Sequence, residues 1–508
     1  MRQSVWHQLL IATVAAIVFF DHLGAMHLWD QDEAFFAQTA VEMQSHNQWV
    51  VPYFNGDLFA HKPPLMFWMM RSGFALFGHT EFAARFWSAV FGLLTTLLMY
   101  HLGRRMFNAR VGLWAGLAMA TAVDFVVVGH AATPDSYLVF FCTLSLYCFA
   151  RTQHWDGNEN AGSELAAAPL PWASCAAMYA AMGAAVLVKG PIGILLPGCT
   201  IGLYLLLAKP VDTQRSEIAG DDRLLSFARR FAPGRILRTF WQLRPLTGLA
   251  VVLCVAGPWF LLVGVQTGGE FLWTFFGVQN IGRFMSAMDN HSGGIWYYFP
   301  AILIGFFPWS IFMVPTAIDL FRRCRQHTWS RGALFLVCWA TVVVGFFSIA
   351  STKLPSYVLP AYPALALATA CFLDRWLCMP EAVSRWWPRC SFGVLLSVGI
   401  VAVVGAAEVL SAGGRWHKVI EKFDLTPEIS SLMPAVIAVG TVLIVGAMAC
   451  LALTKLKQRA GAVVALAVTG LAFLLALGVV ARQVDRFQPS PSVAAAIRGQ
   501  SNGDYQLA

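Results

Sequence analysis

Long apolar stretches recur along the chain and alternate with short polar segments. A membrane-spanning helix needs about 20 mostly apolar residues, and the hydropathy pattern predicts about thirteen such segments. They cover residues 8–26, 83–103, 111–129, 134–151, 171–188, 191–208, 245–265, 296–316, 332–350, 355–374, 391–410, 433–453 and 460–481. The pattern therefore predicts an all-α polytopic membrane protein, with the first segment kept as a signal anchor.

The basic residues indicate the orientation of these segments, because cytoplasmic loops retain Lys and Arg. With the N-terminus inside, the loop at 209–244 is cytoplasmic and carries eight basic residues. The loops at 27–82 and 266–295 then face the periplasm. We expect one transmembrane domain over residues 1–482 and a short periplasmic tail over 483–508, without a sizeable C-terminal soluble domain.

The first outer loop contains two shorter helical patterns. Residues 32–44 have apolar positions on one side and predict a helix that lies at the membrane interface. Pro63 and Pro64 then interrupt the chain before an apolar stretch over 65–77, which is too short to span a membrane. We therefore expect juxtamembrane helices in this loop.

Composition agrees with a membrane protein and excludes other classes. Hydrophobic residues make up 58% of the chain and charged residues 12%, about half the charged share of a soluble globular protein. The net charge of +8 lies in short loops, so we expect no nucleic-acid partner. The eleven cysteines form no Cys-x-x-Cys pair and no metal-binding spacing with histidine.

Six polar clusters fall at the predicted outer ends of the apolar segments. They are Asp32-Glu33, His61-Lys62-Pro63-Pro64, Thr133-Pro134-Asp135, Lys189-Gly190-Pro191, Arg283 with His291, and Lys353-Leu354-Pro355-Ser356-Tyr357. Carboxylates, cations and a tyrosine would thus meet on one face of an apolar scaffold. Such a layout is typical of an active site.

Each cluster has a chemical interpretation and a structural one. Asp32 and Asp135 suit a general base, or alternatively they cap the helices that follow. Lys62, Lys189 and Lys353 suit a phosphate ligand, or alternatively they extend to lipid headgroups. Arg283 has the shape to clamp a phosphate. Tyr357 either donates a hydrogen bond to sugar or phosphate, or belongs to an interfacial aromatic belt.

Two histidines are the candidate ligands for a metal. His61 and His291 lie in different outer loops, and either one also suits a phosphate-binding or interfacial role. No cofactor is certain from the sequence. A divalent ion, Zn²⁺ or Mg²⁺/Mn²⁺, is the one cofactor that these residues suggest.

The clusters, in this order and on this topology, resemble the bacterial GT-C membrane glycosyltransferases. The group in question includes the protein mannosyltransferase-like enzymes and the aminoarabinose transferase of lipid A. The resemblance covers about residues 1–375 and is carried by Asp32-Glu33-Ala34, Asn55-Gly56, Lys62-Pro63-Pro64, Thr133-Pro134-Asp135, Lys189 to Gly193, Asn280 to Phe284 and Lys353 to Pro360.

The resemblance implies an enzyme of the inner membrane whose active site faces the periplasm. It would move a sugar from undecaprenyl phosphate, with inversion, to lipid A or a related glycolipid. Asp32 would be the catalytic carboxylate, with Asp135 as a second catalytic or positioning carboxylate. The remaining predicted contacts to substrate or phosphate are Glu33, Lys62, Lys189, Arg283, Lys353 and Tyr357. Membrane lipids are further expected partners.

Three departures from the aminoarabinose enzymes bear on the acceptor. Many of those enzymes carry an acidic residue at the position of His61, several carry Arg-Tyr at Phe35-Phe36, and they end in a sizeable soluble domain. A protein O-mannosyltransferase and a transporter or flippase of polyprenyl-phosphate lipids are the alternatives. The clusters lie at the outer edge, whereas alternating-access carriers bind near the midplane, which favours an enzyme.

Overall fold

The computed structural model describes residues 2–29, 32–155, 170–208, 230–288, 291–326, 330–411 and 426–488. Nearly all of the regular structure in these ranges is helical. One two-stranded antiparallel hairpin pairs Tyr53 with Leu58 and Phe54 with Asp57. The predicted C-terminal tail from 489 onward and most of the basic loop, residues 209–229, lie outside the described residues.

The N-terminal half begins with one long helix, continues through the short elements of the first loop, and then forms a series of helices from α4 to α13. Its elements are α1 (Arg2–Phe20), α2 (Glu33–Ser45), β1 (Tyr53–Phe54), β2 (Asp57–Leu58), α3 (Leu65–Phe77), α4 (Glu81–Met106), α5 (Ala109–Ala120), α6 (Val123–Gly129), α7 (Asp135–Thr152), α9 (Trp172–Lys189), α10 (Ile192–Ala208) and α13 (Pro233–Gln242).

The C-terminal half contains more breaks between its helices. Its elements are α14 (Pro245–Gln266), α15 (Glu270–Leu272), the π-helix η1 (Trp273–Gly282), α16 (Arg283–Met285), α17 (Tyr298–Gly305), the 3-10 helix η2 (Trp309–Phe312), α18 (Met313–Arg325), α19 (Arg331–Ile349), the 3-10 helices η3 (Pro355–Ala361) and η4 (Pro380–Ala382), α20 (Tyr362–Cys378), α21 (Trp386–Leu410), α23 (Thr426–Lys455) and α24 (Arg459–Asp485).

The helices fit a polytopic membrane protein. Among the described residues nine helices are long and apolar enough to span a membrane, and two bent helix pairs raise this number to eleven. The other two predicted spans coincide with α7 and α10, which are helical but fall short in length or hydropathy. The prediction of an all-α membrane fold is confirmed. The number thirteen is compatible with these helices and stays a prediction.

The two bent pairs satisfy each other's broken backbone. The chain turns by 63° between α5 and α6 and by 117° between α17 and the η2–α18 segment, where Pro308 cannot donate a helical hydrogen bond. Val123 N donates to Phe307 O (3.1 Å), and Trp309 Nε1 donates to Thr121 Oγ1 (2.8 Å). Polar groups freed inside a membrane need protein partners, and here the second break accepts from a backbone N–H of the first, while a side-chain bond also joins the two.

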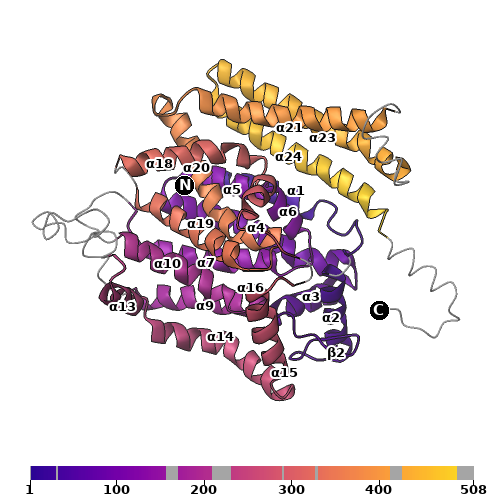
Figure 1. Cartoon of the computed structure of the whole chain (residues 1–508), viewed down its shortest axis with the longest axis vertical. Helices are drawn as coiled ribbons and strands as arrows, with labels where there is room; N and C mark the ends of the chain where they lie inside the picture. The colour runs from indigo at the N-terminus through magenta and orange to yellow at the C-terminus, as the bar shows by residue number, and fades with distance from the viewer. Residues whose placement is uncertain are drawn as a thin grey trace, which may run out of the picture.

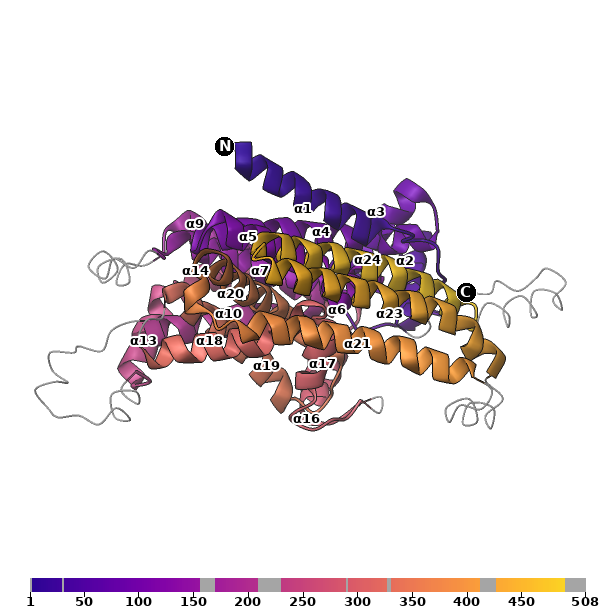
Figure 2. The same cartoon turned by 90° about the horizontal axis from the view of Figure 1, so that it is seen from above.

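The elements of the first loop lie at one end of the helical bundle. In Figures 1 and 2, α2 and α3 lie at the opposite end from α13. This agrees with the predicted placement of the 27–82 and 209–244 loops on opposite sides of the membrane. Helices α2 and α3 confirm the two predicted juxtamembrane helices to within a residue or two.

The last three long helices form a layer along one flank. Helices α21, α23 and α24 run side by side in orange and yellow, and α24 passes next to α1 (Figures 1 and 2). Elsewhere small residues allow close packing: a Cβ on Gly103 of α4 would lie 2.7 Å from the Cα of Gly112 of α5. Such contacts are typical of helix pairs in membranes, where dispersion replaces the hydrophobic drive.

Candidate active site

Three cations converge at the end of the bundle that carries the first loop. Lys62 lies in the turn before α3, Lys189 is the last residue of α9, and Arg283 is the first residue of α16. The pKa of Lys62 is lowered to about 7, first by burial and then by the charges of Lys189 and Arg283, against the raising effect of Asp135 and Asp32. Four predicted site residues therefore lie within electrostatic reach of Lys62.

Asp135 and Lys189 form the ion pair at the centre of this cluster. Lys189 Nζ lies 2.5 Å from Asp135 Oδ1, and both side chains are largely buried. The same ammonium lies 4.9 Å from the centre of the Tyr357 ring, on η3. Asp135 begins α7 and Lys189 ends α9, so each charge also complements its helix dipole.

A π-helix carries Arg283 toward this cluster. Arg283 follows η1, and its Nε donates to Gln279 Oε1 (2.9 Å). Gly190, directly after Lys189, has φ +79°, and a Cβ there would lie 2.6 Å from the ring of Phe275 on η1. The turn after Lys189 thus packs against η1 at a distance that only glycine permits. π-helical segments frequently occur at functional sites.

Asp32 lies between the cation cluster and an apolar cavity. It precedes α2, is exposed, and makes no side-chain hydrogen bond to the helix, so it does not act as the helix cap that the sequence also allowed. Its charge acts on Lys62, and its side chain lines a cavity of about 540 Å³. Asp32 thus has an unblocked carboxylate next to both features.

That cavity, here called the α1–α24 cavity, lies between α1, α6 and the C-terminal helix. Apolar residues of α24 form one wall, and a polar rim surrounds Asp32. The apolar residues are Leu474, Leu475, Leu477 and Ala481, and the polar ones include His22, His27, Arg482 and Asp485. An amphiphile with an apolar body and a polar head would match this lining.

Glu33 is committed to a buried ion pair. Its Oε1 accepts from Arg85 Nε (2.8 Å) and Ala132 N (2.6 Å). Its Oε2 accepts from Arg85 Nη2 (2.7 Å) and Trp29 N (2.8 Å). Four donors fill the four acceptor positions of a carboxylate. This geometry differs from the prediction that Glu33 contacts substrate or phosphate, and it assigns Glu33 to holding α2 against α4.

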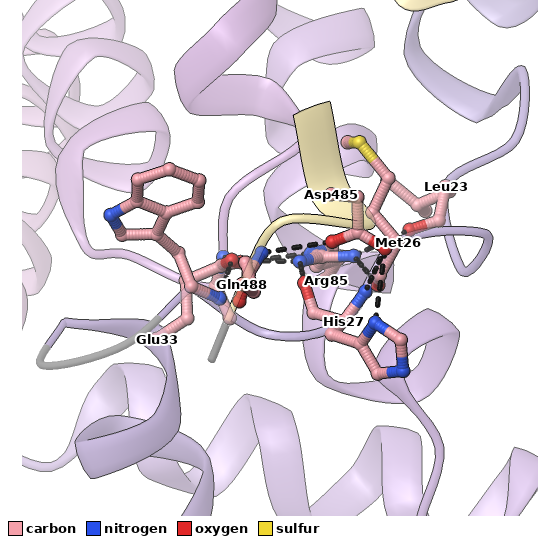
Figure 3. A network of polar contacts seen from close by, with 9 residues as sticks. Leu23, Met26, His27, Glu33, Arg85, Asp485 and Gln488 are labelled. Atoms are coloured by element: carbon pink, nitrogen blue, oxygen red, sulfur yellow. Dashed lines mark hydrogen bonds and ion pairs between the residues drawn. The ribbon is translucent and has the colours of Figure 1, made fainter. Parts of the chain in front are cut away.

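The same network reaches α24. Arg85 also donates to the carbonyl groups of Leu23, Met26 and His27. His27 in turn contacts Asp485 of α24 through Nδ1 (3.0 Å) and through its backbone N (3.3 Å). Figure 3 shows these groups as one connected set from three distant parts of the sequence. The network fixes the backbone at residues 23–29, which lie shortly before Asp32 in the sequence.

Lys353 caps a helix instead of joining the cation cluster. Its buried ammonium donates to the carbonyl groups of Phe347 and Ser348, both at 2.7 Å, at the end of α19. Burial lowers its pKa. These contacts differ from the prediction that Lys353 binds phosphate: unpaired carbonyls at a helix C-terminus attract a cation.

The described side chains do not fit a metal site. No group of three or more His, Cys, Asp or Glu residues in the described ranges is arranged to hold an ion. His61 stacks on Phe59 with ring centres 4.4 Å apart. His291 is exposed, and its carbonyl accepts from Lys353 N (2.9 Å). The suggested Zn²⁺ or Mg²⁺/Mn²⁺ site at these histidines gains no support from this arrangement.

Sequence reasoning missed Arg85 and the contribution of α24. Arg85 lies within the predicted span 83–103, and an ionisable residue in a span is expensive and usually has a partner. That signal was present in the sequence. The pairing of His27 with Asp485 joins residues 458 positions apart, and no local pattern indicates it.

Comparison with known proteins gives consistent matches. The family model described as dolichyl-phosphate-mannose-protein mannosyltransferase matches residues 4–252. The undecaprenyl phosphate-alpha-4-amino-4-deoxy-L-arabinose arabinosyl transferase of Erwinia tasmaniensis is 29% identical over 72% of this chain and 59% of its own length. An uncharacterized protein of Aquifex aeolicus is 28% identical over 72% of this chain and 64% of its own. The chain thus matches less than two thirds of the length of these relatives.

Solved structures extend the match to nearly the whole chain. ArnT from Cupriavidus metallidurans, in its crystal structure bound to undecaprenyl phosphate, superposes with a TM-score of 0.73. The sequence identity is 25%, and the match covers 98% of this chain and 81% of that one. The chain is thus similar in sequence and in fold to the protein mannosyltransferase family model and to the aminoarabinose transferases.

Proposed function

We propose that this protein transfers a sugar from a polyprenyl-phosphate donor to an acceptor at the outer face of the inner membrane. The observation that carries the proposal is the convergence of Lys62, Lys189 and Arg283 beside Asp32. A cluster of cations suits a phosphate, and an exposed carboxylate next to it suits a general base. Among the related proteins, the arabinosyl transferase of Erwinia tasmaniensis is named for undecaprenyl phosphate, and ArnT of Cupriavidus metallidurans was crystallised with it.

In the proposed reaction Asp32 takes the proton of the acceptor hydroxyl. The acceptor oxygen forms a bond to the anomeric carbon from the side opposite the phosphate. The bond from that carbon to the phosphate oxygen breaks, and its electron pair leaves with the polyprenyl phosphate. Lys62 and Arg283 would stabilise the charge that develops on this leaving group, while Asp135 holds Lys189 in position.

The acceptor proposed here is an amphiphile such as lipid A or a related glycolipid. Support comes from the α1–α24 cavity, whose apolar wall leads to a polar rim at Asp32. In this arrangement the donor phosphate and the acceptor would approach Asp32 from different sides. The distribution of Lys and Arg supports a periplasmic site.

The test measures release of free undecaprenyl phosphate from labelled undecaprenyl-phosphate sugars in membranes. Wild type is compared with Asp32→Asn and with Asp57→Asn, an exposed aspartate in the same loop. Loss of the general base should lower release by about 10²-fold or more, and Asp57→Asn should leave it unchanged. Full release by Asp32→Asn would overturn the proposed mechanism. Binding without release from every donor would favour a lipid carrier.

A further inference from the structure

A second cavity lies on the other side of α2 from Asp32. It measures about 390 Å³, is here called the α2–α4 cavity, and shares no lining residue with the α1–α24 cavity. Its walls come from α2, the β1–β2 hairpin, α3 and the start of α4. They include Leu28, Ala34, Phe35, Gln38, Val41, Phe54, Asn55, Phe74, His79, Thr80 and Glu81.

Residues 27–29 and the start of α2 contribute side chains to both cavities. His27 and Trp29 line the α1–α24 cavity, whereas Leu28 lines the α2–α4 cavity, as expected where side chains alternate in an extended chain. At the start of α2, Asp32 lines the first cavity and Phe35 the second. The two cavities therefore adjoin the same part of the chain.

The α2–α4 cavity has a fixed frame. One oxygen of the Glu42 carboxylate accepts from Asn55 N (2.8 Å) and Gln38 Nε2 (3.1 Å), and the other accepts from Gly56 N (3.3 Å). Asn55 and Gly56 have φ +51° and +82°, which matches the two-residue Asn-Gly turn of β-hairpins. Glu42 thus ties the hairpin to α2 and fixes the rim of the cavity.

The lining combines aromatic rings with polar side chains that remain available. Phe35 is 37% exposed, and its ring centre lies 4.8 Å from that of Phe54. The side chains of Asn55, His79 and Glu81 make no hydrogen bond or ion pair to other described residues. Aromatic faces pack against the C–H faces of a pyranose, and amide and carboxylate groups bind its hydroxyls.

The charge of the lining selects among sugars. Glu81 is the acidic member, and no Lys or Arg of the described residues lines the cavity. A phosphate or a uronic acid would meet the Glu81 carboxylate here without a Lys or Arg side chain to attract it, in contrast to the cation cluster around Lys62. An uncharged sugar, or one that bears an amino group, fits the lining.

We propose that the α2–α4 cavity is a subsite for an uncharged or amino-bearing sugar of a glycan acceptor. The role in transfer rests on the proposed function, because the acceptor hydroxyl must reach Asp32 on the other side of α2. Sugar binding itself does not depend on transfer. The two can be measured separately.

The experiment is saturation-transfer NMR on the purified full-length protein. The probes are methyl β-D-glucopyranoside, methyl β-D-glucosaminide and methyl β-D-glucuronide. We expect the first two to bind and the glucuronide not to bind. Phe35→Ala should weaken binding about tenfold, and Glu81→Gln should weaken the glucosaminide more than the glucoside. Tyr53→Ala is the matched control, because Tyr53 neighbours Phe54 on β1 and does not line the cavity.

The outcomes separate this inference from the proposed function. The subsite would be overturned if none of the three sugars bound, or if the glucuronide bound as tightly as the other two. It would also be overturned if Phe35→Ala and Tyr53→Ala lost the same amount of sugar affinity. Asp32→Asn should abolish transfer and leave sugar binding unchanged. Sugar binding that depends on Phe35 in a protein that transfers nothing would keep the subsite and refute the transferase.

Discussion

The affinity for the donor phosphate should depend on pH through Lys62. Burial and two neighbouring cations lower the pKa of Lys62 to about 7 from an ordinary value of 10.5. About half of these side chains are therefore charged at neutral pH in the empty site. The first pH unit above 7 reduces the charged fraction about fivefold, and the next one about tenfold. Between pH 7 and 9 the affinity for an anion that needs the ammonium should fall by up to about 50-fold.

The assay is equilibrium binding of a fluorescent polyprenyl phosphodiester to the purified protein in nanodiscs between pH 6 and 9. A phosphodiester keeps one negative charge over this range, so a change in affinity reports on the protein. Lys62→Arg keeps its charge at every pH tested and should give a flat profile. Lys62→Met should bind about 10- to 100-fold more weakly at pH 6, where the wild-type side chain is charged.

Two results would refute this reasoning. A flat wild-type profile would mean that Lys62 does not contact the phosphate or keeps its proton throughout. If the affinity of Lys62→Arg fell with pH as steeply as that of wild type, the group that titrates would be another residue.

Three further variants test the structural assignments. Arg85→Met leaves the Glu33 carboxylate buried without its partner and should destabilise the protein by about 3–5 kcal/mol in reversible unfolding. Lys353→Met removes the cation at the end of α19 and should cost about 2 kcal/mol of stability without changing phosphodiester affinity; reduced affinity in a well-folded variant would return this lysine to the phosphate site. Gly190→Ala should push Phe275 aside, destabilise by about 1 kcal/mol or more and lower donor affinity; an unchanged melting temperature and affinity would contradict the close packing described above.

The sequence predicted the membrane fold and the outer-loop helices because their signals are local. Helices α2 and α3 follow from apolar periodicity and from the Pro63-Pro64 interruption. The convergence of the Asp135 and Lys189 segments was also expected, since all the polar clusters fell at the same ends of the spans. The ion pair between them is a closer contact than the pattern could specify.

The sequence could not distinguish the structural contacts of Glu33 and Lys353 from the site roles predicted for the other charged residues of their clusters. Both are charged residues in clusters that predict a site, and both find structural partners. Lys353 reaches carbonyl groups only five and six residues away, but this requires the chain to turn back over the end of α19. Glu33 forms an ion pair with Arg85, 52 residues away. This pairing depends on which face of α2 packs against α4, and the sequence does not show that.

The contact of α24 with the first loop has a consequence for biosynthesis. Residues 459–485 supply one wall of the α1–α24 cavity, and Asp485 holds His27 next to the backbone that leads to Asp32. A chain that emerges from the ribosome N-terminus first makes its candidate catalytic carboxylate early, but it lacks this wall until α24 has entered the membrane. A polypeptide that stops before α24 would contain every candidate catalytic residue and still lack a closed acceptor cavity.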